Sequence, residues 1–214
     1  EVGAIGFGCM GMSEFYGETD DAQSLETLAH AFDAGVTLFD TADIYGFGHN
    51  ERLVGRFIRD KRDRVVIATK AGIVRVQDDP ARRGVDNSPA YLTEHCEASL
   101  ARLGTDHVDL FYLHRIDPAT PLEESIGTLA RLREAGKIRG IGLSNVTLET
   151  VLAAHSIHPV TAVQNEFSLF TRADQDRLLP ELARLGIGYV PYSPLGRGML
   201  TSGSQPGSLA DDDF

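Results

Sequence analysis

Short apolar runs alternate with longer segments of mixed character along the chain. The runs lie at residues 4–8, 36–39, 65–69, 108–113, 138–143, 161–164 and 187–191. Continuous apolar runs of this length, bounded by polar residues or glycine, are typical of strands that are buried on both faces. The sequence therefore predicts seven buried strands.

The segments between the strands carry apolar residues at helical spacing. In one of them the shared helical face consists of Leu53, Val54, Phe57 and Ile58. Such a face packs against a sheet when a helix covers it. We expect six helices, around residues 25–32, 53–58, 89–103, 121–135, 147–155 and 174–185.

Residues at the helix ends support these assignments. Ser88 and Pro89 are typical of an N-cap and a first helical position, and Gly104 is a typical stop for the same helix. Thr120 begins a capping-box pattern at the start of the fourth helix. Pro180 indicates either a kink in the last helix or a late start for it.

This order of elements predicts the fold class. Strands that alternate with helices over short links are parallel and are joined by right-handed crossovers. A closed barrel of this kind has eight strands and eight helices. We expect an α/β protein with the TIM (β/α)8 barrel fold, in which residues 1–214 form a single domain with seven strands and six helices. The last residues, after Gly198, are expected to be a loop, and the barrel is expected to be incomplete at its C-terminus.

One connection, residues 71–87, is long and strongly polar. It is either a solvated excursion from the barrel or a lid over the ends of the strands. Both alternatives treat the segment as a loop.

Four residues with chemically useful side chains end or follow predicted strands: Asp40, Tyr45, Lys70 and His114. In barrels of this type the carboxyl ends of the strands form one rim, which is where catalysis takes place. We therefore expect these side chains to converge. Lys70 is one of three lysines in the chain and directly follows an apolar strand. Its ammonium group would be costly to bury without a partner, so the sequence implies a nearby anion.

Composition narrows the possible partners. The net charge is −11, and no run of lysine and arginine is present. We therefore expect no nucleic-acid partner. The two cysteines, Cys9 and Cys96, have no metal-site spacing and suit a reducing compartment. With no signal-like or membrane-spanning segment, a cytoplasmic protein without a membrane partner is expected. The sequence does not indicate an oligomeric state.

Several motifs occur in the order that is found in one known family. They are GFGCMGM (6–12), FDTADIYG (39–46), ATK (68–70), LHRID (113–117), GIGLSN (140–145), VQNE (163–166) and PYSPLG (191–196). In these motifs the chain resembles the aldo-keto reductases over nearly its whole length. The resemblance implies a nicotinamide-dependent oxidoreductase that reduces aldehydes or ketones to alcohols.

The resemblance also implies a role for each residue at the rim. Tyr45 matches the acid/base, Lys70 and Asp40 match the pair that adjusts its pKa, and His114 matches the residue that orients the substrate. Chemistry agrees, because a free phenol has a pKa roughly three units above neutral and a nearby ammonium lowers it. Taken singly, Asp40 could instead satisfy loop N–H groups, Tyr45 could be an ordinary loop aromatic, and His114 could be a satisfied buried histidine. No metal is needed.

The cofactor implied by the resemblance is NADPH, bound across the barrel mouth. No G-x-G-x-x-G follows a strand, so a Rossmann domain is not indicated. The residues that match carboxamide contacts are Ser144, Asn145 and Gln164, which could alternatively cap strand ends. Tyr192 matches the aromatic that stacks on the nicotinamide. The residues that match the pyrophosphate loop are Ser193, Leu195, Gly196 and Arg197. The choice of NADPH over NADH rests on the resemblance alone.

The substrate and two rival functions complete the hypothesis. Aromatic residues near the rim (Phe15, Tyr16, Phe167 and Phe170) suit small carbonyl substrates with apolar bodies, although the last two could equally be core residues. A lysine at a strand end could instead form a Schiff base, as in an aldolase. A third reading is a regulatory subunit that binds the cofactor without catalysis. A metal-dependent hydrolase is disfavoured, because the chain contains no His-x-His pair.

Overall fold

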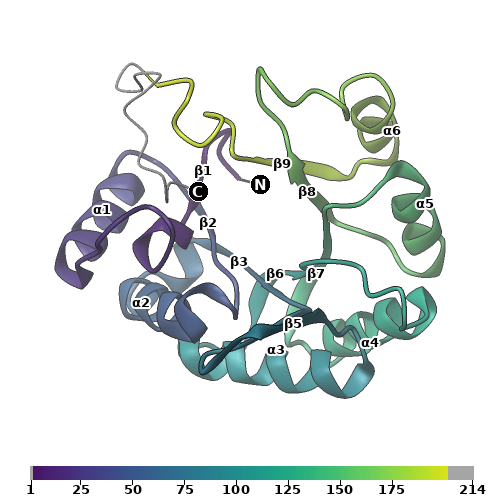
Figure 1. Cartoon of the computed structure of the whole chain (residues 1–214), viewed down its shortest axis with the longest axis horizontal. Coiled ribbons are helices and arrows are strands. Elements are labelled where there is room, and N and C mark those ends of the chain that lie inside the picture. Colours follow the sequence, from purple (N-terminus) through teal and green to yellow (C-terminus); the bar gives the residue numbers. More distant parts are fainter. Residues whose placement is uncertain (1, 202–214) are drawn as a thin grey trace.

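Seven parallel strands form a strongly curved sheet in a computed structural model that describes residues 2–201 (Figure 1). In sheet order they are β1 (Gly6–Gly8), β2 (Leu38–Asp40), β3 (Val66–Ala71), β6 (Val108–Leu113), β7 (Ile138–Ser144), β8 (Ala162–Glu166) and β9 (Gly188–Tyr192). Each strand pairs with the one before it in the main series, so β1 and β9 form the two edges of the sheet among the described residues.

Six helices surround the outside of this sheet (Figure 1). They are α1 (Asp21–Asp33), α2 (His49–Ile58), α3 (Pro89–Leu103), α4 (Leu122–Glu134), α5 (Leu148–Ile157) and α6 (Leu178–Leu185). The predicted seven barrel strands and six helices are therefore confirmed, with shifts of a few residues at their ends. None of the helices within residues 2–201 combines the length and apolar character that a membrane crossing requires. The loop expected after Gly198 extends beyond Thr201, outside the described residues.

The long polar connection contains structure that was not predicted. Strands β4 (Ile73–Val76) and β5 (Asp79–Val85) pair as an antiparallel hairpin, so the interpretation of the segment as a loop is wrong. The hairpin forms a two-stranded sheet separate from the barrel. Short 3-10 helices occupy three other links: η1 (Met10–Met12), η2 (Tyr45–Gly48) and η3 (Arg62–Arg64).

The helix ends follow the sequence signals in two of three cases. The hydroxyl of Ser88 accepts a hydrogen bond from the Tyr91 N–H, and Gly104 ends α3 with φ +66°. Pro180 is the third residue of α6, so it marks a late start rather than a kink. The capping box at Thr120 is wrong: Pro121 is the N-cap, and the Thr120 hydroxyl donates to Asp117 instead.

Two apolar layers hold the barrel together. The larger layer lies between the sheet and the helices. The smaller one fills the interior of the sheet and consists of Leu38, Ala68, Tyr112 and Ala162. The ring of Tyr112 lies over Gly142 on the neighbouring strand, at a place where any Cβ on residue 142 would overlap it. Glycine is therefore needed at position 142 for the interior to close.

We expect Gly142→Ala to lower the free energy of unfolding by about 1–3 kcal/mol, because the new methyl group must displace the Tyr112 ring. The matched control is Gly127→Ala in α4, where an added Cβ meets only the side chain of Arg131, at an ordinary 3.6 Å. That change should stabilise the protein by about 0.5–1 kcal/mol through helix propensity. Urea denaturation of both variants measures the difference. Equal stabilities would show that the barrel interior is not tightly packed.

Candidate active site

A buried ion pair lies at the carboxyl ends of β2 and β3. Lys70 has 0% of its surface exposed, and its Nζ donates to Oδ1 of Asp40 and, at 2.8 Å, to the carbonyl oxygen of Thr41. Asp40 is thus the anion that the position of Lys70 implied. Since both groups are largely shielded from water, their attraction is far stronger than that of a surface pair.

Tyr45 and His114 join this pair from the adjoining loop and strand. The Nζ of Lys70 lies 5.2 Å from the centre of the Tyr45 ring. The Tyr45 ring meets the His114 ring edge to face, with centroids 5.9 Å apart and an interplanar angle of 83°. The structure therefore brings all four predicted catalytic residues together on one rim.

Burial and charge alter the protonation of the phenol and the ammonium. Burial raises the pKa of Tyr45, and the neighbouring Lys70 opposes this without reversing it. Lys70 therefore acts in the expected direction, but burial outweighs it. Burial on its own lowers the pKa of Lys70, but the attraction of Asp40 and Tyr45 outweighs it and the net shift is upward. At neutral pH the site holds a neutral phenol beside a firmly protonated lysine.

His114 is held in its neutral form. Burial, followed by the charges of Lys70 and Arg115, lowers its pKa well below the usual 6.5. Its Nδ1 is buried and has no hydrogen-bond partner among the described residues. Buried polar atoms are nearly always satisfied, so this nitrogen is an exception.

The predicted carboxamide-binding residues form a second group, and one of them contacts the first. Gln164 donates through Nε2 to Oδ2 of Asp40 at 2.8 Å, a contact that sequence reasoning did not anticipate. Asn145 donates to the Ser144 hydroxyl at 2.9 Å and accepts from the Tyr192 hydroxyl at 2.6 Å. Ser144, Asn145 and Tyr192 are therefore linked across the ends of β7 and β9.

The loop after β9 holds the remaining predicted cofactor residues, which are Ser193, Leu195, Gly196 and Arg197. It turns tightly, with the Gly196 N–H bonded to the Ser193 carbonyl at 2.9 Å, and it leaves Leu195 exposed. Ser193 and Arg197 have left-handed φ angles of 50° and 54°. Asn145 shares this conformation with φ 55°. Such residues cost of order 1–3 kcal/mol each and are concentrated at functional sites.

Two buried polar residues behind the rim were missed by sequence reasoning. Asn50 accepts from the Thr41 hydroxyl at 2.7 Å and donates to the Cys9 carbonyl at 2.8 Å, so it fixes the residue whose carbonyl holds Lys70. Glu51 accepts from the hydroxyl of Thr69, the residue before Lys70, at 2.6 Å. Asn50 and Glu51 lie on the same face of α2 as Leu53 and Val54, which follow them by three positions. A polar residue on an apolar helix face is the signal that could have revealed them.

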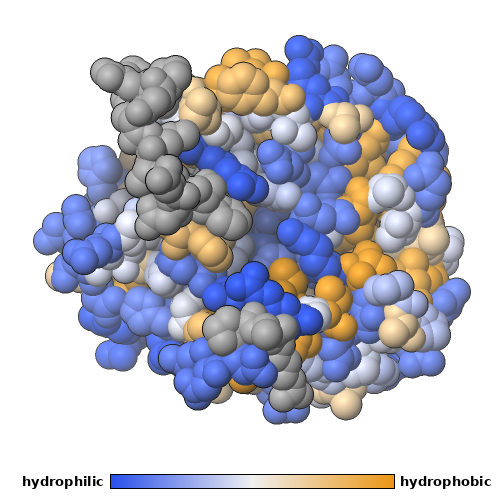
Figure 2. Space-filling model, in the orientation of Figure 1, coloured by the Kyte–Doolittle hydropathy of each residue, from blue (hydrophilic) through white to orange (hydrophobic). Residues whose placement is uncertain are grey.

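The aromatic residues proposed for the substrate pocket divide into two kinds. Phe15, Tyr16 and Phe170 are exposed large side chains, with Phe170 68% accessible. Phe167 is instead half-buried and packs edge to face on Tyr189, with centroids 6.0 Å apart. The face that carries the hairpin is hollowed near its centre, with hydrophilic residues around the hollow and hydrophobic ones beside it (Figure 2).

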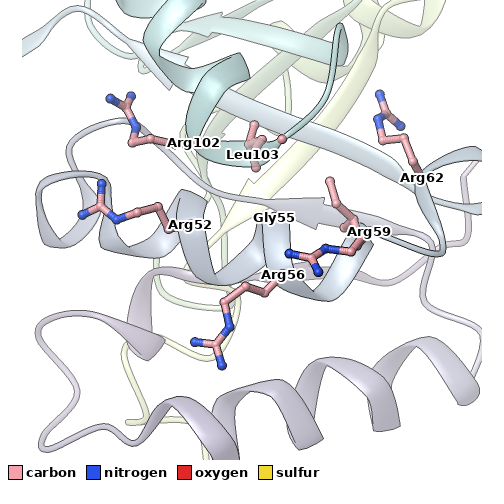
Figure 3. A pocket seen from close by; sticks show the side chains of 9 residues that line it. Arg52, Gly55, Arg56, Arg59, Arg62, Arg102 and Leu103 are labelled. Atoms are coloured by element: carbon pink, nitrogen blue, oxygen red, sulfur yellow. The ribbon is translucent and has the colours of Figure 1, made fainter.

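A separate surface pocket of about 370 Å³ lies between α2 and the end of α3, and it contains none of the four rim residues. Its arginines are Arg52, Arg56, Arg59, Arg62 and Arg102. Their guanidinium groups fan out rather than converge, and Arg56 points toward the helix below (Figure 3), where it pairs with Asp21. Arginines at the C-terminal ends of two helices are explained by the helix dipoles.

Comparison with known proteins identifies the family. The model of the Aldo/keto reductase family matches residues 4–213. The chain belongs to the aldo/keto reductase family. A relative from Glycine max, named "Probable aldo-keto reductase 1", is 44% identical over an alignment of 205 residues. The alignment covers 92% of this chain and 57% of the relative. This aldo-keto reductase chain thus spans a little over half the length of that relative.

Solved aldo-keto reductases share the fold. Glycerol dehydrogenase AKR11B4 from Gluconobacter oxydans superposes with a TM-score of 0.91 at 30% identity, over 100% of this chain and 66% of that one. An aldo/keto reductase from Klebsiella pneumoniae, solved in complex with NADP and acetate, gives a TM-score of 0.78 at 31% identity, over 94% of this chain and 68% of that one. The predicted family and barrel class are both confirmed.

The lowered pKa of His114 predicts a loss of stability in acid. The unfolded chain takes up a proton near pH 6.5 and the folded chain does not, so unfolding becomes more favourable as the pH falls below that value. Between pH 7.5 and 5.5 this residue should account for a loss of stability on the order of 1 kcal/mol. His114→Asn should remove that part of the loss, as measured by urea denaturation at both pH values. The exposed His30→Asn is the control, and identical pH dependence in wild type and His114→Asn would contradict the assignment.

Proposed function

We propose that this chain carries the catalytic site of an NADPH-dependent reductase that converts aldehydes or ketones to alcohols, with Tyr45 as the general acid. Membership of the aldo/keto reductase family supports an oxidoreductase that acts on carbonyl groups. The observation that supports Tyr45 as the acid is its position beside Lys70 and His114 at the ends of the strands. The centre of its ring lies 5.2 Å from Nζ of Lys70 and 5.9 Å from the centre of the His114 ring.

Tyr45 holds the proton that the product alcohol requires. Because burial raises its pKa, the phenol is protonated at neutral pH and can donate a hydrogen bond to the oxygen of a carbonyl substrate. As negative charge develops on that oxygen, it becomes a stronger base than the phenolate and takes the proton. The protonated Lys70 then stabilises the phenolate that is left, and Asp40 keeps Lys70 protonated.

His114 orients the substrate. As a neutral imidazole it carries one N–H donor and one acceptor nitrogen. A donor beside Tyr45 fixes the carbonyl oxygen against the phenol without adding a second positive charge to the site.

The residues across the barrel mouth fit a nicotinamide cofactor, which when bound supplies the hydride for the carbonyl carbon. Gln164 uses Nε2 for Asp40, and within the described part of the chain no hydrogen bond reaches its Oε1, so it can accept from a carboxamide. Ser144 and Asn145 offer further polar groups, and Tyr192 offers a flat ring. The left-handed residues Ser193 and Arg197 belong to a loop of the kind that binds phosphate through its backbone. NADPH rather than NADH is supported by the family resemblance and by the NADP complex of the Klebsiella pneumoniae relative.

The same geometry argues against a Schiff-base mechanism. A lysine must lose its proton before it can attack a carbonyl carbon. The raised pKa of Lys70 and its contacts with Asp40 and Thr41 hold it in the charged form, in which all its donors are directed at oxygen atoms or the phenol. Lys70 is therefore better suited to stabilising a phenolate than to acting as a nucleophile.

We expect Tyr45→Phe to lower kcat for reduction of an aromatic aldehyde by roughly 10²–10⁴-fold, the usual contribution of a positioned acid. Affinity for NADPH should change by less than about twofold, because the phenol acts on the substrate. The assay follows NADPH oxidation, and cofactor binding is measured by fluorescence.

Tyr112→Phe is the matched control, because it removes another buried phenol hydroxyl, one inside the barrel that has no partner among the described residues. Its turnover should equal that of the wild type. Normal turnover in Tyr45→Phe would remove Tyr45 from the acid role.

A further inference from the structure

The β4–β5 hairpin lies on the catalytic face of the barrel. It begins at Ile73, three residues after Lys70, and in Figure 1 it runs in front of α3 toward the side where α2 lies. It pairs with no barrel strand among the described residues. Its side chains and backbone nevertheless reach the loop that carries Tyr45, and they do so at two separate points.

The first attachment is made by Arg75 of β4. Its NH1 lies 3.0 Å from Oε2 and 3.3 Å from Oε1 of Glu14, and its guanidinium carbon lies 4.9 Å from the centre of the Phe47 ring. The side chains of Arg75 and Glu14 are 24% and 14% exposed, so water screens this pair less than an ordinary surface pair. Arg75 thus joins the hairpin both to the loop after β1 and to the loop after β2.

The second attachment runs through α3. The Tyr91 hydroxyl donates to the Ile73 carbonyl at 3.3 Å, and the Tyr91 ring stacks on His95 with centroids 3.8 Å apart. His95 in turn contacts Asp43 through Nδ1 and Oδ2 at 2.6 Å. The side chain of Asp43 is 4% exposed, so this contact is shielded from competition by water.

These two attachments flank the catalytic tyrosine. Asp43 lies two residues before Tyr45, and Phe47 lies two residues after it. Here the backbone passes through two left-handed residues, Gly46 with φ 53° and Phe47 with φ 52°. The glycine adopts this conformation freely, but the phenylalanine does not. A phenylalanine stays in that region only when its surroundings hold it there. The hairpin supplies part of those surroundings.

We propose that the β4–β5 hairpin is a clamp that positions Tyr45, with Arg75 as the positioning residue that joins the hairpin to Glu14 and Phe47. Arg75 contacts Glu14 and Phe47, so it acts on Tyr45 through the loop. The expected effect of the clamp on catalysis rests on the proposed function. Its expected effect on the order of residues 43–48 does not.

The structural consequence is tested by amide hydrogen exchange of the full chain, measured by mass spectrometry over residues 43–48. Arg75→Met should raise exchange in this segment roughly tenfold by allowing the loop to open locally. Arg75→Lys keeps the charge and should restore exchange to within about twofold of the wild type. Arg177→Met, which breaks an exposed arginine–glutamate pair with Glu149 at 2.9 Å, is the matched control and should leave the segment unchanged.

Glu14→Gln tests the same contact from its other side and should also raise exchange over residues 43–48. Combining it with Arg75→Met should add little, because both changes break one contact. This second variant keeps the test decisive even where Arg75→Met alone folds poorly, since it leaves no unpaired, shielded carboxylate. Normal exchange in Glu14→Gln and in the double variant would overturn the clamp.

The catalytic consequence has its own readout. Arg75→Met should lower kcat for an aromatic aldehyde by roughly ten- to a hundredfold, the effect of misplacing a catalytic group, while KM for NADPH changes by less than about twofold. Arg75→Lys should recover most of kcat. If exchange responds as expected but no variant, including the wild type, reduces the aldehyde, the proposed function fails and the clamp stands. If aldehyde reduction is normal in wild type and in Arg75→Met alike, the positioning role is wrong.

Discussion

The buried ammonium of Lys70 is the constraint on which the site depends. A cation with no exposed surface must have an anion and further acceptors within reach, or it loses its proton or unfolds its surroundings. The strand register supplies them: Asp40 pairs with Ala68, two residues before Lys70, so Nζ reaches both Asp40 and the Thr41 carbonyl. A slip of one residue would turn Lys70 away from Asp40 and toward the helices.

This ion pair connects parts of the barrel that are not neighbours. Asp40 binds Lys70 through one oxygen and Gln164, from β8, through the other. Since β8 is not adjacent to β2 in the sheet, the carboxylate ties opposite sides of the barrel mouth together. A residue proposed to hold the cofactor therefore also holds the group that keeps Lys70 charged. The contacts of Asp40 with Lys70 and Gln164 therefore serve both the charge state of the site and the shape of the rim.

The barrel could be predicted from the sequence because its strands read as continuous apolar runs, although the edge strands β1 and β9 are largely exposed or half-buried in the structure. Asp40 and Lys70 could be paired in advance because a lysine after such a run needs an anion. Tyr45 and His114 were proposed from their positions at or after strand ends and from family motifs, and the structure brings them to the same rim.

Other features could not be predicted, for identifiable physical reasons. The hairpin was missed because a two-stranded sheet over a polar segment has no buried apolar face to produce a pattern. The capping box failed because the N-cap of α4 is Pro121, which leaves Thr120 one residue outside the helix. The net direction of the Tyr45 pKa shift could not be predicted, because burial, which depends on the whole fold, outweighs the single nearby charge. The Gln164 contact joins residues that are distant in sequence and has no local signal.

The central claim is that the Lys70–Asp40 contact is one coupled unit. A double-mutant cycle in the free energy of unfolding, with Asp40→Asn, Lys70→Met and the double variant, tests it most directly. Each single change should cost about 3–5 kcal/mol by leaving its partner buried without a counter-charge. The double variant should be more stable than the sum of the two losses predicts by at least about 2 kcal/mol. Losses that add to within about 0.5 kcal/mol would show that the two side chains act independently and would contradict the account.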